Sequence, residues 1–139
     1  MAASDTLCIL MAAVYAGFGI TLAIAPDVFF GPESPLSYWT TMGPDGVWFG
    51  RATGVWMTFV TTSPYWAGIP KDALCKVYLP INLIVSGLIA QAAFLMDNTG
   101  PGKNALLPTL NLWVPQVAIS VAFVLLNLAV VSSPKVKSN

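Results

Sequence analysis

The sequence predicts an all-α integral membrane protein, a single domain over residues 1–139 built as a bundle of four transmembrane helices. Of its residues, 56% are hydrophobic and only 9% are charged, whereas a soluble domain carries about 25% charged residues. The apolar residues gather in four stretches, each close to the roughly 20 residues that cross a bilayer. No stretch shows the period-two alternation of a membrane β-barrel, so we expect helices, which satisfy their own backbone hydrogen bonds in lipid.

The first helix is expected near the N-terminus and closes at Pro26. No positive charge precedes it, and its apolar core is longer than that of a signal peptide, so we expect it in the mature protein. No transit peptide is visible in front of it. The four helices are expected at about residues 7–25, 47–63, 77–96 and 106–131, the last with its apolar stretch starting at Leu110.

Helix breakers separate the remaining helices. The second helix follows the turn at residues 43–46 and should end before Pro64, and the third and fourth are closed by polar segments at residues 97–102 and 132–134. Pro80 and Pro115 fall inside the third and fourth helices, where proline removes a backbone donor. We expect kinks there, although a freed carbonyl is also a site for water or for the magnesium of chlorophyll.

Lysine positions predict the orientation of the bundle. With four helices, both termini and the loop at residues 65–76 share one side, which collects Lys71, Lys76, Lys135 and Lys137. The opposite side has Lys103 and Arg51. Because positive charge favours the cytoplasmic side, we expect both termini in the cytoplasm or an equivalent compartment such as a plastid stroma.

Several reactive residue types are missing or scarce. The chain has no histidine, which removes the commonest general base, the commonest haem ligand and the imidazole ligand of zinc. Cys8 and Cys75 are too far apart for a CxxC motif and too few for a metal cluster, and both are expected to be free, apolar thiols on the reducing side. Because these residue types are missing or scarce, we expect no enzyme, no catalytic residues, no metal and no haem. Because the net charge is zero, we also expect no nucleic-acid partner.

Arg51 is the most informative charge, because it lies about one turn inside the second predicted helix. An ionisable residue in a membrane span is costly unless it snorkels or finds a partner. Two interpretations stay open beside a catalytic one: a salt-bridge and amide network that fixes helix packing, and a site for a polar or anionic head group. The partners expected at the same depth are Asp27, Asp45, Gln91, Asn111 and Gln116.

Aromatic, amide and small residues give weaker signals. Tryptophans such as Trp48, Trp56 and Trp113 favour membrane anchoring, with pigment stacking as the alternative, and Asn82 is a further oxygen donor for a pigment. The aromatic and proline-rich loop at residues 26–46 is expected to make contacts outside the membrane. Small residues spaced four apart predict close helix approach at Gly50/Gly54, Ala12/Ala16, Ala13/Gly17 and Ser86/Ala90.

Three segments resemble the DoxX-like family of small four-helix membrane proteins. They are Tyr15 to Gly19, Ala25 to Phe30 and Phe49 to Trp56, matching a glycine-rich first helix that ends near proline and an Arg-x-x-Gly that opens the second. The resemblance implies the four-helix fold and an inward-facing Arg51. It also implies a quinone, sterol or lipid in a pocket lined by Arg51, Gln91, Asn111 and Gln116.

In character, a short, histidine-free, tryptophan-rich helical chain is similar to the small accessory subunits of algal photosystem supercomplexes. It lacks the Glu-x-x-(Asn/His)-x-Arg motif of the antenna proteins themselves. This resemblance implies a non-catalytic accessory or linker subunit in the thylakoid membrane of a plastid, for example around photosystem I. Its helices would contact lipids, other membrane subunits, chlorophyll and carotenoid.

Overall fold

The computed structural model describes residues 2–30, 43–95 and 113–133, and its elements are all helices. Four long helical segments are present, which confirms the predicted helix number. The first segment is continuous from Ala3 to Ile24 and contains one π-helical turn. The elements are α1 (Ala3–Met11), η1 (Ala12–Ala16), α2 (Gly17–Ile24), η2 (Pro26–Val28), α3 (Pro44–Trp66), α4 (Lys71–Leu95) and α5 (Trp113–Ser132).

Polar first turns extend three of the helices beyond their predicted starts. The first segment begins at Ala3, where the Asp5 carboxylate accepts a hydrogen bond from the Ala2 amide at 3.0 Å. Pro44 occupies the first turn of α3, and α4 begins at Lys71 rather than near residue 77. Hydropathy misses such turns because their polar residues lower the local average, although the helix dipole favours the acidic side chains Asp5, Asp45 and Asp72 in these first turns.

The second helix also ends later than predicted, because α3 continues through Pro64 to Trp66. Proline at position 64 removes the donor that would pair with the Val60 carbonyl. The Ser63 hydroxyl donates to that carbonyl at 2.7 Å instead. A neighbouring side chain therefore repairs the hydrogen bond that the proline breaks.

Three of the four long segments are long and apolar enough to cross a bilayer, namely residues 3–24, 71–95 and 113–132. The 23-residue α3 is long enough but less apolar, since Asp45, Arg51 and a run of threonines and serine lower its hydropathy. The described chain is thus compatible with a membrane protein. Insertion of α3 and the side on which the termini lie stay predictions.

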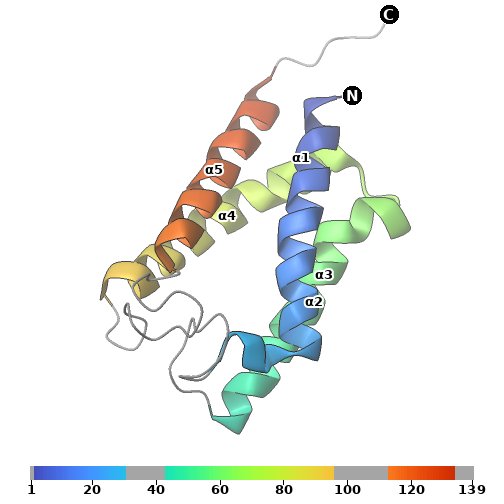
Figure 1. The fold of residues 1–139 in the computed structure, drawn as a ribbon. Helices are drawn as coiled ribbons and strands as arrows, with labels where there is room; N and C mark the ends of the chain where they lie inside the picture. Colours follow the sequence, from blue (N-terminus) through green and yellow to red (C-terminus); the bar gives the residue numbers. More distant parts are fainter. Residues whose placement is uncertain (1, 31–42, 96–112, 134–139) are drawn as a thin grey trace, which may run out of the picture.

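The helices form two pairs that are joined at one end of the molecule (Figure 1). α2 packs along α3, and α4 packs along α5, while α1 contacts both α4 and α5. The start of α1, the end of α5 and the turn between α3 and α4 lie toward this joined end. An ion pair reinforces it, with the Lys71 Nζ 2.7 Å from the Asp5 Oδ1.

The hydrophobic core lies at this joined end. Its seven buried side chains come from α1, α4 and α5, and they are Leu7, Cys8, Met11, Leu74, Cys75, Tyr78 and Phe123. Large exposed apolar side chains cover the outer faces of all four long segments. Such an outer surface is unfavourable in water and natural in lipid.

Glycines bring α2 and α3 into backbone contact. A Cβ on Gly19 would lie 2.6 Å from the Gly54 carbonyl oxygen, and a Cβ on Gly54 would overlap the Gly19 carbonyl oxygen. The close approach predicted at Gly54 is confirmed. The absence of side chains at Gly19 and Gly54 therefore lets the two backbones touch at this level.

Candidate functional site

An apolar pocket of about 360 Å³ lies between the two helix pairs. Side chains from η1, α2, α3, α4 and α5 contribute to its wall, and most of them are aliphatic or aromatic. The lining residues are Val14, Tyr15, Phe18, Leu22, Phe29, Phe30, Phe49, Gly50, Thr53, Met57, Val85, Ile89, Trp113 and Gln116. A volume of this size is within the range of small-molecule sites in proteins.

Tyr15 forms the boundary between the pocket and the core. It stands in the π-helical turn η1, a local widening that is often found at functional sites. Its ring stacks on Tyr78, with centroids 5.7 Å apart, and contacts Phe123 at 5.0 Å. Its hydroxyl donates a 2.7 Å hydrogen bond to the Asn82 Oδ1. These three contacts fix the ring, so one pocket wall is held rigidly.

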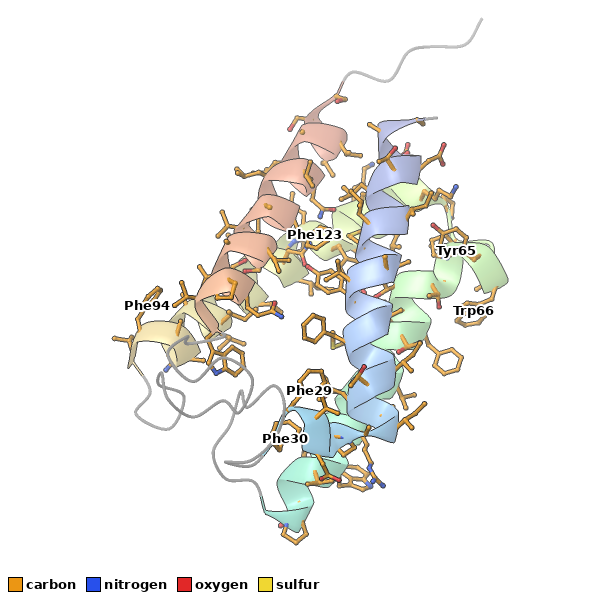
Figure 2. All side chains as sticks on the ribbon, in the orientation of Figure 1. Phe29, Phe30, Tyr65, Trp66, Phe94 and Phe123 are labelled. Atoms are coloured by element: carbon orange, nitrogen blue, oxygen red, sulfur yellow. The ribbon has the colours of Figure 1, made fainter. Side chains whose placement is uncertain are left out.

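The aromatic floor of the pocket comes from the segment that follows α2. The Phe29 ring stacks on Phe18 at 5.5 Å. Phe30 lies against Gly50, since a Cβ on Gly50 would be 3.3 Å from the Phe30 ring. Figure 2 shows Phe29 and Phe30 where the first segment meets α3, whereas Tyr65 and Trp66 lie at the other end of α3. Glycine at position 50 therefore makes room for an aromatic pocket wall.

Few polar side chains reach the pocket. Among its lining residues, only Tyr15, Thr53 and Gln116 carry polar side-chain atoms beyond the indole of Trp113. A mostly apolar wall with a small number of polar groups is the usual composition of a site that binds an apolar molecule and orients its polar end. The arrangement is chemically suited to binding.

Two asparagines are buried inside the helix bundle. Asn82 is 1% exposed and Asn127 is 0% exposed. Asn127 donates to the Phe123 carbonyl at 2.8 Å, and Ser86 donates to the Asn82 carbonyl at 2.6 Å. Within the described residues, the Asn82 Nδ2 and the Asn127 Oδ1 have no hydrogen-bond partner. Unpaired buried polar atoms are costly, so a polar group within hydrogen-bond distance of either atom would be stabilised.

Among the described residues of the predicted Arg51 network, one lines the pocket and the others do not. Gln116 lines the pocket. Arg51, Asp27, Asp45 and Gln91 have exposed side chains, and none of these four lines the pocket. In the part of the chain that the structure describes, Arg51 forms no ion pair. Asn111 lies outside the described residues. The inward-facing Arg51 implied by the DoxX-like resemblance is not what the structure shows.

The four predicted pigment contacts also separate. Trp113 lines the pocket, whereas Trp48 and Trp56 are 66% and 71% exposed on the outside of α3. Asn82 is enclosed within the bundle, where its Oδ1 already accepts the Tyr15 hydroxyl. A pigment outside the bundle therefore has access to the two α3 tryptophans and not to the Asn82 side chain.

Sequence reasoning missed two features. Tyr15 was treated only as part of a glycine-rich segment, and no periodicity announces a π-helical turn. Cys8 and Cys75 are expected as free thiols on the same side but not as a pair, and their sulfur atoms lie 3.9 Å apart. The available signal was topological, because each cysteine stands a few residues inside a helix end on the same predicted side. Both thiols are free, and no group of three or more metal-ligating side chains occurs among residues 2–30, 43–95 and 113–133.

Comparison with protein-family models, with characterised proteins and with solved structures finds no match to this chain. The two resemblances therefore stay predictions, and the pocket has to be interpreted from its own chemistry.

Proposed function

We propose that this chain is a non-catalytic membrane protein that binds an apolar small molecule or a lipid chain in the pocket between its helix pairs. The pocket itself carries the proposal, because about 360 Å³ of space is lined mainly by aliphatic and aromatic side chains from five elements. A ligand that enters from lipid already lies in an apolar medium, so close packing against this wall, together with the few polar groups, would provide its preference for the pocket. An isoprenoid quinone, a sterol or a lipid acyl chain has the required chemistry.

The polar groups of the pocket support a ligand with one polar end. Thr53 lies on α3 and Gln116 on α5, which belong to different helix pairs. Tyr15 lines the pocket on the side of the core, where its hydroxyl donates a hydrogen bond to Asn82. A ligand carbonyl or hydroxyl near these groups would be oriented by them, while its hydrocarbon part fills the aromatic region. This composition favours a quinone or a sterol over a purely aliphatic chain.

Filling the pocket tests the proposal. Val85 lines the pocket on α4, and its neighbour Ile84 is 65% exposed and does not line it. We expect Val85→Trp to expel the ligand and Ile84→Trp to leave it bound. The wild-type protein and both variants are purified in mild detergent, and the apolar molecules that remain bound are extracted and quantified by mass spectrometry.

The outcome is decisive only if the fold is retained, which circular dichroism and size-exclusion chromatography check for both variants. Retention of the same stoichiometric molecule by the wild-type protein and by Ile84→Trp, with its loss from Val85→Trp, supports the proposal. Equal content in all three proteins contradicts it.

Of the two interpretations that the position of Arg51 left open, its exposure favours contact with a polar or anionic head group. Its side chain is exposed, and the neighbouring Gly50 and Thr53 line the pocket instead. We propose that the guanidinium reaches the membrane surface, where it meets anionic head groups. Arg51→Gln should then leave the pocket ligand bound, whereas a role of Arg51 in the pocket predicts its loss.

A second candidate function is supported by the outer face of α3. Trp48, Trp56, Phe59 and Trp66 are all more than half exposed and follow one face of the helix along its length. Trp56 and Phe59 lie toward the middle of α3, where interfacial anchoring does not account for aromatic rings. We propose this stripe as the contact surface of an accessory or linker subunit with other membrane subunits, chlorophyll or carotenoid, with a photosystem supercomplex of a thylakoid membrane as the leading context.

The absorption spectrum of the protein isolated with its neighbours tests this second candidate. The native membrane is solubilised in mild detergent, and the fractions that contain the chain are separated by size. Chlorophyll and carotenoid bands in a large fraction, lost when Trp56 is replaced by alanine, support it. A small, colourless particle without other subunits contradicts it.

A further inference from the structure

We propose that Cys8 and Cys75 form a peroxide-sensitive dithiol site that closes into a disulfide between α1 and α4. The two sulfur atoms are 3.9 Å apart, although 67 positions separate the residues along the chain. A disulfide has sulfur atoms about 2.05 Å apart, so they have to approach by roughly 2 Å. The chain contains two cysteines in total, so each has only this partner within the molecule.

The surroundings of the pair favour an intramolecular bond. Both cysteines are 0% exposed, so a second copy of the chain has no access to either sulfur. The same two helices are held together by the ion pair of Asp5 with Lys71, which lies one turn before Cys75. The Cys8 thiol also lies 3.7 Å from the Lys71 carbonyl oxygen, as a weak donor. The helices therefore have little freedom to separate at this level.

The chemistry needs an oxidant small enough to enter the helix bundle, and we assign this role to hydrogen peroxide. One sulfur attacks the peroxide, the O–O bond breaks, and a sulfenic acid and water form. The second sulfur then attacks the sulfenic sulfur, the S–O bond breaks, and a second water leaves. Two thiols and one peroxide thus give one disulfide and two waters, and a dithiol reductant reverses the change.

The bond would act on the end of the bundle that carries the core. It would join α1 to α4 beside Met11 and Tyr78, which are core neighbours of the pair. Covalent closure of a long loop restricts the unfolded chain and raises stability. The inference does not depend on what occupies the pocket, so either proposal can fail without the other.

Thiol counting tests the site on the full chain in mild detergent. The protein is treated with hydrogen peroxide, or with copper(II)–phenanthroline under air as a second oxidant. It is then denatured and labelled with a maleimide–polyethylene glycol. Untreated protein should take two labels, and oxidised protein should take none, run as a monomer without reductant, lose two hydrogen atoms by intact mass and melt several degrees higher. Dithiothreitol should restore both labels and the original melting temperature.

The Cys8→Ser and Cys75→Ser variants serve as matched controls, because each leaves one cysteine. Neither variant can form the intramolecular disulfide, so neither should lose two hydrogen atoms by intact mass after peroxide treatment or show a rise in melting temperature, and oxidation of the remaining thiol would add oxygen instead. The proposal is overturned if folded wild-type protein keeps both labels with both oxidants, or if oxidation gives only disulfide-linked dimers or only sulfinic and sulfonic acids. The wild-type result stands even where a serine variant fails to fold.

Discussion

At the scale of single residues, Tyr15 and Gly54 fix how the neighbouring helices pack. Tyr15 separates the pocket from the core, and it is fixed by one hydrogen bond and two ring contacts. Gly54 sets the spacing of α2 and α3. Both residues act through their position rather than through reactivity, which agrees with a binding function.

Replacing Gly54 by alanine should destabilise the protein by about 1–3 kcal/mol, the usual cost of overpacking. The added Cβ would overlap the Gly19 carbonyl oxygen on α2, which is backbone and has little room to move. Thermal unfolding in detergent measures the change. Gly87→Ala on α4 is the control, because nothing lies within 4 Å of the Cβ it adds. An equal effect of both substitutions would contradict the α2–α3 contact.

Tyr15→Phe should cost about 1 kcal/mol, since the Asn82 Oδ1 loses the donor that satisfies it inside the bundle. The ring contacts remain in this variant, so the cost isolates the hydrogen bond. Unfolding curves of the wild type and the variant give the difference. Tyr65→Phe is the matched control on an exposed tyrosine, and it should have no measurable effect.

At the scale of elements, helix ends are decided by local hydrogen bonds that hydropathy does not detect. α3 continues beyond Pro64 because the Ser63 hydroxyl donates a hydrogen bond to the Val60 carbonyl oxygen. α4 starts six residues before its predicted position, because its first turn is polar and carries Asp72 near the helix N-terminus. Predicted apolar stretches are therefore shorter than the helices that contain them.

Ser63→Ala should shorten α3 at Pro64. Without the hydroxyl, the Val60 carbonyl is left without its donor, and the last turn loses about 1 kcal/mol. Hydrogen exchange of the residue 65–67 amides should become faster. Thr62→Ala is the control, since the Thr62 hydroxyl donates to the Thr58 carbonyl within an uninterrupted stretch of helix. Faster exchange in both variants, or in neither, would contradict this role of Ser63.

At the scale of the whole molecule, the arrangement is a pair of helix pairs joined at the end where α1 begins. The joined end has the core, the ion pair and the two cysteines. The pocket lies beyond Tyr15, where the pairs separate. The packed core and the pocket therefore lie on opposite sides of Tyr15.

We expect α3 to cross the bilayer, although it is the least apolar of the four long segments. Single cysteines at Ala2, Asp45 and Ala67 are introduced into a chain in which Cys8 and Cys75 are serine. A membrane-impermeant maleimide should label Ala2→Cys and Ala67→Cys from one side of sealed vesicles and Asp45→Cys from the other. Labelling of positions 45 and 67 from the same side would show that α3 does not cross.

The fold class could be predicted from the sequence, but most of the site could not. Gln116 and Trp113 were expected to matter and do line the pocket. Arg51 was expected to point inward, because burial of a charge in a span normally requires a partner, yet its side chain is exposed and a long arginine can reach polar surroundings instead. Tyr15 could not be singled out, since its importance comes from a π-helical turn and from contacts with α4 and α5.

Composition and segment length by themselves determined four long helices, because apolar stretches of about 20 residues with few charges have one stable backbone solution in lipid. Only the tertiary structure decided which side chains meet. It brought Cys8 next to Cys75, joined Tyr15 to Asn82 and set Gly19 against Gly54. These contacts depend on how each helix is rotated about its own axis and on which helices are its neighbours. The hydropathy of a single helix determines neither.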